Sequence, residues 1–397
     1  MITLLGYGKT TKAIAKKFAP GCIVFDDNFK ENSTDKFGNL LLKPEKFENY
    51  KTDIQIPSPG FPPNHPLIQK SQNLVSEYDF FLRDIPFSIW ISGTNGKTTT
   101  TQMLEHLLKD KNAQAGGNIG LPLAEMDKTK DIWILESSSF TLHYTKLATP
   151  DIYLLLPIKP DHISWHGSFK EYEDAKLSVL FRMKEGSVAI IPKKYENLDT
   201  LCHKVTYENE DDLAKKMDIE IEKIEFQSPF LLDSILAMSC EKILFNRIDY
   251  KKMNSFKTDR HKLEEFEDKS GRLWVNDSKG TNVDATLEAL KRYKNREILL
   301  ILGGDDKGVS LDRLFDALKP LHVKIYAIGS NSDKITSMSK TIGKEVHNCK
   351  YLKDAISLIK KSHTQKSVAL LSPAASSLDQ FSSYAQRGDE FMELALS

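Results

Sequence analysis

Short apolar runs alternate with helical patterns along the whole chain. The first run, at residues 2–5, is followed by Gly6-Tyr7-Gly8, by a helix-like stretch to about residue 18, and by a second apolar run at 22–25. A strand, a tight turn, a helix and a strand in this order predict a Rossmann-type unit. Proline and glycine cluster at 57–63, which predicts a loop.

The alternation continues towards the C-terminus. We expect further strands at 89–92, 132–135, 152–156, 188–191, 273–276, 298–302, 323–328 and 368–371, with helices between several of them. This pattern predicts an α/β fold with mostly parallel sheets covered by helices. We expect three domains: a Rossmann-like domain at 1–82, a central phosphate-loop domain at 83–256 and a second Rossmann-like domain at 257–397. Nearly half of the residues in 193–226 are charged, which predicts a peripheral, solvated excursion.

Composition excludes several classes of protein. The 397 residues carry 55 Lys plus Arg and 55 Asp plus Glu, so no basic excess points to nucleic acid or an anionic membrane as a partner. The four cysteines are far apart, which predicts reduced thiols in a cytoplasmic protein. Neither a secretory signal nor an apolar run long enough for a membrane helix is visible, so we expect no membrane insertion.

The strongest chemical signal is a glycine-rich turn between a predicted strand and a predicted helix. Glycines let backbone N–H groups surround phosphate oxygens, and a helix N-terminus adds positive partial charge. A lysine in the turn would contact the outer phosphates of a nucleotide, and the next hydroxyl would join a Mg²⁺ shell. The glycines are closer together than in the usual Walker pattern, yet the turn predicts a nucleotide site at Gly93, Thr94, Asn95, Gly96, Lys97, Thr98 and Thr99.

Three further residues are candidates for metal chemistry. Glu136 ends a predicted strand at the edge where α/β sheets bind ligands, and its pairing with the phosphate loop favours a Mg²⁺ ligand. His162 follows another strand, and the pattern alone does not decide between a ligand and an ordinary loop histidine. Lys176 lies on a predicted helix, where a lone lysine is expected to be a solvated surface charge.

Polar segments follow three predicted strands of the last domain, at 276–282, 302–307 and 371–379. Each alone is compatible with a plain turn, but three such strand ends in one domain predict a binding rim. In the first domain, Gly6-Tyr7-Gly8 with Asp26 is only part of a dinucleotide fingerprint, so an NAD site is disfavoured.

Together these motifs resemble the Mur ligase family of ATP-dependent amide-forming enzymes. The resemblance runs from Leu5 to the C-terminus, and it rests on the phosphate loop, Gly117-Asn118-Ile119-Gly120, Asp161-His162, Ala175-Lys176-Leu177 and residues 371–381, among other blocks. It implies ligation of D-glutamate to UDP-N-acetylmuramoyl-L-alanine through an acyl phosphate, in cytoplasmic peptidoglycan synthesis. It further implies ATP and two Mg²⁺ ions as cofactors, and we expect a monomer. The block 371–381 is what favours D-glutamate.

The resemblance also implies roles for single residues. It puts the UDP-linked substrate near Thr10, Asp26, Asp27, Gly60, Asn118 and Ser138. One Mg²⁺ ion would bind Thr98 and Glu136, and a second would bind His162 and Lys176, with the lysine carried as a carbamate. The catalytic residues would be Lys97, His162 and Lys176. ATP would also contact Lys262 and Asp277, and D-glutamate would lie among Lys279, Thr281, Lys307, Ser377, Leu378 and Tyr384.

The chain departs from the family's pattern in places. The expected His-Arg reads His261-Lys262, so the arginine contact to the γ-phosphate becomes a lysine contact or is made by the displaced Arg260. The expected Gly-x-His-Asn segment reads 227–231 Gln-Ser-Pro-Phe-Leu, so the usual adenine-side asparagine is missing. Tyr384 stands where a phenylalanine is common.

Two other interpretations stay open. A sister ligase, such as a folylpolyglutamate synthase-like enzyme or the diaminopimelate-adding member of the family, would accept a different amino acid. A phosphate-loop NTPase switch would hydrolyse ATP without a UDP-sugar. A scaffold is disfavoured by the intact set of Lys97, Thr98 and Glu136, and a zinc-ribbon amidotransferase by the lack of closely spaced cysteines.

Overall fold

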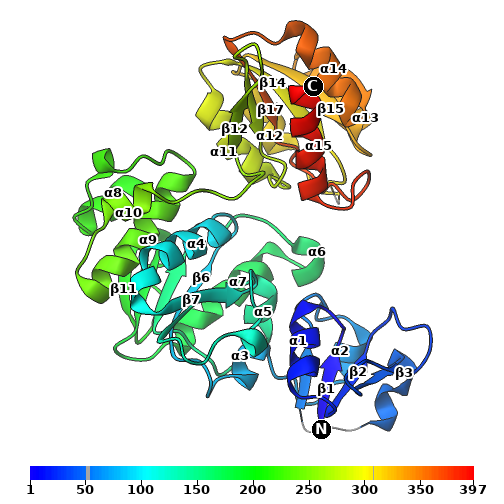
Figure 1. Cartoon of the computed structure of the whole chain (residues 1–397), viewed down its shortest axis with the longest axis vertical. Coiled ribbons are helices and arrows are strands. Elements are labelled where there is room, and N and C mark those ends of the chain that lie inside the picture. The colour runs from blue at the N-terminus through cyan, green and yellow to red at the C-terminus, as the bar shows by residue number, and fades with distance from the viewer. Residues whose placement is uncertain (51–53, 307) are drawn as a thin grey trace. The chain divides into compact units, whose positions relative to one another are not determined.

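Three β-sheets organise the protein, whose computed structural model describes residues 1–50, 54–306 and 308–397 (Figure 1). Contacts divide the chain into two compact units, Met1–Phe256 and Lys257–Ser397. The first unit contains two of the sheets and the second unit contains the third. The boundary expected near residue 82 lies inside the first unit, and the division into three domains stays a prediction.

The first sheet has the strand order β3-β4-β2-β1-β5. β1 (Ile2–Leu5) pairs in parallel with β2 (Cys22–Phe25) and β5 (Ile54–Pro57), β2 pairs in parallel with β4 (Leu40–Leu42), and the short β3 (Ser33–Thr34) is antiparallel to β4. Helix α1 (Lys9–Lys17) follows the Gly-Tyr-Gly turn as expected, and α2 (Pro66–Lys70) and α3 (Glu77–Phe80) come later. The two apolar runs are strands because their side chains fill the core.

The second sheet has six parallel strands in the order β11-β10-β9-β6-β8-β7. They are β6 (Phe87–Ser92), β7 (Ala113–Gly117), β8 (Ile132–Glu136), β9 (Ile152–Leu155), β10 (Val188–Pro192) and β11 (His203–Tyr207). The helices of this part are α4 (Lys97–Leu107), α5 (Ser139–Tyr144), α6 (Ile163–His166), α7 (Phe169–Arg182), α8 (Glu210–Lys216), α9 (Phe230–Phe245) and α10 (Tyr250–Asn254). Sequence patterns predicted four of these strands and missed the two at the edges.

The prediction of a solvated excursion at 193–226 is wrong. This stretch supplies β11, which pairs in parallel with β10, and helix α8. Tyr207 and Leu213 are buried, whereas charged residues such as Lys193 and Glu208 pair on the surface. Elements at the edge of a sheet have one buried face and one solvent-exposed face, so a high content of charged residues is compatible with regular structure.

The third sheet has the order β12-β13-β17-β14-β15-β16 and is parallel except for the antiparallel β12. Its strands are β12 (Glu264–Glu267), β13 (Leu273–Asn276), β14 (Glu297–Gly303), β15 (Val323–Ile328), β16 (Val346–Lys350) and β17 (Ser367–Leu371). Its helices are α11 (Val283–Tyr293), α12 (Asp312–Leu318), α13 (Ser332–Thr341), α14 (Leu352–Ser362) and α15 (Tyr384–Leu396). The α/β class with mostly parallel sheets is thus confirmed.

Short 3₁₀ turns connect several elements, at Pro44–Asn49, Lys109–Lys111, Leu123–Glu125, Lys193–Tyr195 and Ile221–Lys223. The four cysteines are unpaired and buried. Within the described part of the chain, every helix is too short or too polar to cross a membrane.

Candidate active site

The phosphate loop joins β6 to α4 and has the backbone that close approach to phosphate needs. Gly93 (φ 141°) and Gly96 (φ 88°) are left-handed, and a Cβ on Gly96 would lie 2.3 Å from Oδ1 of Asp233 in α9. The Lys97 ammonium donates hydrogen bonds to the carbonyl oxygens of Gly93 (3.1 Å) and Thr94 (2.7 Å). The loop therefore combines glycines, a cation and a helix N-terminus, which fits the phosphates of a nucleotide.

Glu136 is the centre of a second polar group beside this loop. Thr98 Oγ1 donates to Glu136 Oε2 (2.8 Å), and Asn118 Nδ2 donates to Oε1 (2.7 Å). Glu136 is buried, so it is not an ordinary solvated acid at a strand end. Hydroxyl and carboxylate oxygens are ligands that Mg²⁺ prefers, so Thr98 and Glu136 fit a Mg²⁺ ion. Nearby, Ser138 begins α5 and its hydroxyl accepts from the Thr141 N–H (3.1 Å).

Lys176 contradicts the expectation of a solvated surface charge. Its side chain is 1% exposed, and its ammonium donates to Gly93 O (2.9 Å) and Ser92 Oγ (3.3 Å). Burial, together with the nearby charge of Lys97, holds the pKa of Lys176 well below its usual value. Pattern analysis failed here because helix α7 turns this position towards the phosphate loop, a direction that a single lysine in the sequence does not reveal.

Tyr172 connects the phosphate loop with Lys176 and His162, and sequence analysis missed it. Its hydroxyl bonds to Thr94 Oγ1 (3.0 Å), and the Lys176 ammonium lies 4.7 Å from its ring centroid. The exposed His162 (φ 51°) lies 6.1 Å from the same ring, and its N–H donates to Asp161 Oδ1 (2.8 Å). The signal was present, because Tyr172 and Lys176 are four residues apart and share one helix face. For Asp233, no sequence signal pointed to the loop.

The proposed metal ligands are not all in contact. In residues 1–50, 54–306 and 308–397, no three His, Cys, Asp or Glu side chains are close enough together to hold a metal ion. Thr98 and Glu136 touch each other, whereas His162 and Lys176 each lie near the ring of Tyr172.

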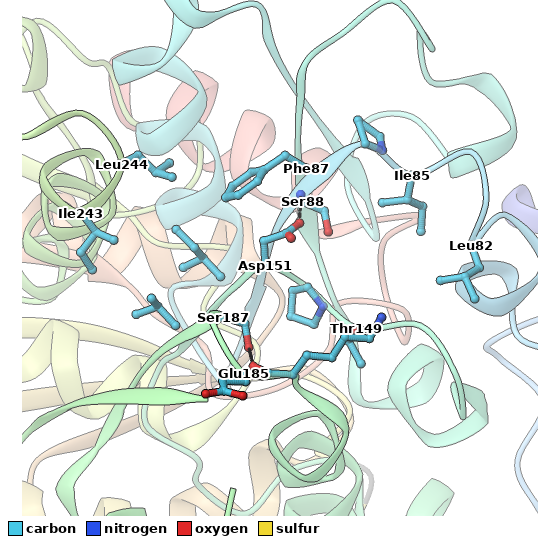
Figure 2. A pocket seen from close by; sticks show the side chains of 16 residues that line it. Leu82, Ile85, Phe87, Ser88, Thr149, Asp151, Glu185, Ser187, Ile243 and Leu244 are labelled. Atoms are coloured by element: carbon cyan, nitrogen blue, oxygen red, sulfur yellow. Dashed lines mark hydrogen bonds between the residues drawn. The ribbon is translucent and has the colours of Figure 1, made fainter. Parts of the chain in front are cut away.

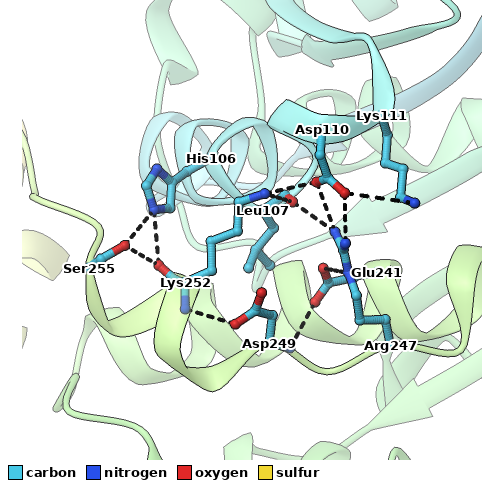
Figure 3. Close-up of polar contacts among 9 residues, drawn as sticks. All are labelled: His106, Leu107, Asp110, Lys111, Glu241, Arg247, Asp249, Lys252 and Ser255. Atoms are coloured by element: carbon cyan, nitrogen blue, oxygen red, sulfur yellow. Dashed lines mark hydrogen bonds and ion pairs between the residues drawn. The ribbon is translucent and has the colours of Figure 1, made fainter.

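Helix α4 is anchored at its far end as well (Figure 3). Asp110, just beyond that end, accepts from Arg247 Nη1 (2.7 Å) and Lys252 Nζ (2.8 Å). The same two cations donate to the Leu107 carbonyl oxygen, which the helix leaves unpaired. Hydrogen bonds from Arg247 and Lys252 hold the pKa of Asp110 well below its usual value. The helix that begins in the phosphate loop is therefore fixed at both ends.

The candidates for the UDP-linked substrate in the first sheet lie just beyond the carboxyl ends of β1, β2 and β5. They are Thr10, Asp26, Asp27 and Gly60. Asp27 pairs with His65 Nε2 (2.7 Å), and the Gly60 carbonyl accepts from Trp165 Nε1 (3.2 Å) in α6. The carboxyl edge of a parallel sheet is where such folds bind ligands, and the role of these residues in substrate binding stays a prediction.

In the second unit, the three polar strand ends form one rim, as predicted. Asp305 and Ser376 exchange two backbone hydrogen bonds (2.9 Å each), and the Ala374 N–H donates to the Gly280 carbonyl (3.1 Å). The rim carries the candidates for D-glutamate. Lys279 pairs with Asp259 (3.3 Å), Thr281 is exposed, Ser377 is buried, and Leu378 and Tyr384 are exposed. Lys307 lies outside the described residues.

Asp277 lies beneath this rim, and its carboxylate is buried. It accepts from Ser372 Oγ (2.6 Å) and from the Leu263 N–H (3.3 Å), and burial raises the pKa of Asp277 to about 7. Lys262, which precedes Leu263, is close enough to favour the charged form of Asp277. Arg260, the alternative contact for the γ-phosphate, pairs with Asp389 (2.7 Å).

A pocket of about 730 Å³ opens at the opposite end of the second sheet, at the amino ends of β6, β9 and β10 (Figure 2). Ser88 and Asp151 are joined there by two hydrogen bonds. The Ser88 N–H donates to Asp151 Oδ2 (2.7 Å), and the Asp151 N–H donates to Ser88 O (2.9 Å). None of the candidate residues lines it. The pocket is therefore separate from the site at the carboxyl edge.

Known proteins resemble this chain along its whole length. Residues 91–233 match the Mur ligase middle domain. The UDP-N-acetylmuramoylalanine--D-glutamate ligase of Campylobacter jejuni is 55% identical over 396 residues, covering 99% of this chain and 98% of the relative. The Helicobacter pylori ligase of the same name is 43% identical over 418 residues, covering 100% and 99%. The MurF ligase from Thermotoga maritima in complex with ADP shares the fold, with a TM-score of 0.60, 14% identity and 94% coverage of each chain.

Proposed function

The chain belongs to the Mur ligase family, and we propose that it joins D-glutamate to UDP-N-acetylmuramoyl-L-alanine in an ATP-dependent reaction of peptidoglycan synthesis. The observation that carries this proposal is the 55% identity, over almost the full length of both chains, to a relative that bears this activity in its name. Sister ligases are disfavoured, because the likeness to MurF, at 14% identity, extends to the fold alone. The substrates are small molecules made where ATP is available, so we expect a cytoplasmic enzyme.

The chemistry explains why ATP is needed. A carboxylate is a poor acyl donor, because its charge repels a nucleophile and oxide is not a leaving group. Transfer of the γ-phosphoryl group from ATP to the substrate carboxylate gives an acyl phosphate and ADP. The amine of D-glutamate then attacks the acyl carbon, the C–O bond to phosphate breaks, and the amide, phosphate and a proton are released.

The phosphate loop supports the first step. Lys97 would move from the carbonyl oxygens that it now contacts to the outer phosphates of ATP. Thr98 and Glu136 would hold a Mg²⁺ ion, whose chemistry is to neutralise charge on the transferring phosphoryl group. Asn118, already bonded to Glu136, and Ser138 are proposed to face the substrate carboxylate. Lys262 and Asp277 are also proposed to contact ATP.

The burial of Lys176 supports the proposal that it is carried as a carbamate. A neutral amine adds to CO₂ and releases a proton, whereas an ammonium does not. Because burial lowers the pKa of Lys176, the neutral amine is available near neutral pH to a larger extent than on a surface lysine. The product has two oxygens and a negative charge next to Lys97, so it would serve as a ligand for the second Mg²⁺ ion, together with His162, which also lies near Tyr172.

The remaining assignments follow from position. Thr10, Asp26, Asp27 and Gly60 are proposed to bind the UDP part, because they share the carboxyl edge of the first sheet. The D-glutamate site is proposed at the rim of the second unit, with Lys279, Thr281, Lys307, Ser377, Leu378 and Tyr384.

A phosphate-release assay tests the function directly. The enzyme would be given ATP, UDP-N-acetylmuramoyl-L-alanine and, one at a time, D-glutamate, L-glutamate, glycine and diaminopimelate. We expect phosphate release that requires the UDP-sugar and D-glutamate together. Release with ATP alone at the same rate would favour the NTPase switch, and preference for another amino acid would favour a sister ligase.

A further inference from the structure

Arg387 is a buried cation in the second unit that no part of the proposed reaction uses. Its side chain is 1% exposed, in the first turn of α15. Its Nε donates to Ser278 Oγ (2.9 Å), and its Nη2 donates to the carbonyl oxygens of Ser278 (2.9 Å) and Ala375 (3.3 Å). Ser278 Oγ in turn donates to the carbonyl oxygen of Tyr384 (2.8 Å), the first residue of the same helix.

The guanidinium therefore joins two segments of the rim. Ser278 immediately precedes Lys279, and Ala375 lies two residues before Ser377. The planar fork of an arginine fixes the direction of every hydrogen bond that it makes, which a flexible ammonium does not. Arg387 thus adds a side-chain link between the two halves of the proposed D-glutamate site, beside the backbone hydrogen bond from Ala374 to Gly280.

The direct hydrogen-bond partners of Arg387 are neutral oxygens. Throughout the described residues, none of its hydrogen-bond partners is a carboxylate, and no carboxylate forms an ion pair with it. Asp277 and Asp379 act on it only from farther away, and burial lowers the pKa of Arg387 to about 10, so it stays cationic at neutral pH. A buried cation whose hydrogen bonds go to neutral oxygens holds those oxygens firmly, because charge-assisted hydrogen bonds are stronger than neutral ones.

We propose that Arg387 is a positioning residue that sets the geometry of the amino-acid site, acting through Ser278 and Ala375 without touching the substrate. This inference rests on the proposed function and adds a determinant of its specificity for an acidic amino acid. It predicts that changes at Arg387 alter the use of D-glutamate and leave the use of the UDP-linked substrate alone, since the latter's candidates lie in the first unit.

The test measures steady-state phosphate release by the full chain, with D-glutamate varied at saturating UDP-N-acetylmuramoyl-L-alanine and then the reverse. Arg387→Lys keeps the charge and loses the fork, and it should raise KM for D-glutamate about tenfold. Arg387→Gln also removes the charge and should raise it about a hundredfold. KM for the UDP-linked substrate should stay within about a factor of two in both.

Phe391→Leu is the matched control for a loss of stability. Phe391 lies on the same helix, is buried, and packs against Trp274 away from both segments. The Phe391→Leu variant should have a lower melting temperature than the wild type and an unchanged KM for D-glutamate. If Arg387→Lys does not fold, Ser278→Ala decides, because it removes one acceptor of the guanidinium and should raise KM for D-glutamate several-fold.

An unchanged KM for D-glutamate in a folded Arg387→Lys or, in its place, Ser278→Ala variant would overturn the inference. Equal increases of KM for both substrates would overturn it too, because that is what a general loss of structure produces. A wild-type enzyme with no release dependent on D-glutamate would instead overturn the proposed function, so the two failures are distinguishable.

Discussion

At the scale of the residue, a substitution of Lys97 should impair catalysis without impairing the binding of the UDP-linked substrate. Lys97→Ala should lower kcat for ligation by roughly 10²–10³, because it removes a cation from the transferring phosphoryl group. Affinity for UDP-N-acetylmuramoyl-L-alanine, measured by calorimetry, should change by less than about a factor of two, since the proposed uridine site belongs to the first sheet. Lys170→Ala is the matched control, because that exposed lysine pairs only locally with Asp174. A large loss of affinity in Lys97→Ala would contradict this division.

Lys176 tests whether a buried amine has been converted into an anion. In ¹³C-bicarbonate, the wild-type enzyme should show a carbamate carbon signal that Lys176→Ala lacks. The variant should keep less than about 1% of the activity, because the proposed ligand of the second Mg²⁺ ion is lost. Short carboxylic acids should restore part of the activity by occupying the vacated space. Full activity of the untreated variant would show that the carbamate is not needed.

The same residues show what sequence patterns reach and where they stop. Gly93, Lys97 and Glu136 were predicted correctly as neighbours of the phosphate loop. Each lies at the end of a strand or the start of a helix, and such positions can be recognised from the local sequence. Lys176 was misjudged as a surface charge, since its burial depends on which face of α7 meets the sheet. Arg387 belongs to Gln386-Arg387-Gly388, one of the blocks behind the family resemblance, but no role was predicted for it, because its partners Ser278 and Ala375 come from two other strand ends.

At the scale of the element, the strands that patterns missed in the second and third sheets are all edge strands. β7 and β11 flank the second sheet, and β12 and β16 flank the third. Central strands are covered on both faces and read as apolar runs, whereas edge strands keep one side wet and carry polar residues. The sequence 264–267, Glu-Glu-Phe-Glu, therefore gives no apolar run, although it pairs with β13 over its whole length.

The ion pairs of Asp110 at the end of helix α4 should make the stability of the protein depend on pH. Asp110→Asn should destabilise the protein by about 1 kcal/mol at pH 7, a value reduced from that of a buried pair because the carboxylate is 44% exposed. The folded pKa lies below the unfolded value near 3.9, so this stability is present above that pH and is lost as the pH falls through the folded pKa.

The difference in melting temperature between wild type and Asp110→Asn should therefore stay constant from pH 7 down to about pH 4 and shrink as the pH falls further, and it should also shrink in 1 M salt. Glu222→Gln, an exposed acid in the same unit, is the control and should change little at any pH. A difference that persists undiminished at pH 3 would mean that Asp110 acts through packing and not through charge.

At the scale of the whole molecule, the second unit has its own six-stranded sheet and its own core. Trp274, Tyr326 and Phe391 belong to that core, which draws on no residue of Met1–Phe256. Residues 257–397 expressed alone should therefore unfold in one cooperative transition, followed by circular dichroism, and should release no phosphate from ATP. The matched piece, residues 1–256, should also melt cooperatively. A broad, featureless melt of 257–397 would show that the unit depends on the rest of the chain.

The polar edge strand β12 has a consequence beyond its own sheet. Its outer backbone groups are a template on which a second molecule could add a strand, which is how proteins polymerise through their edges. Glu265 and Glu267 are exposed on one face of β12, so a second copy laid antiparallel along it would bring carboxylates opposite carboxylates, with Arg292 compensating only the charge of Glu265. The acidity that hides this strand from pattern recognition is thus also what discourages the folded molecules from assembling into fibres.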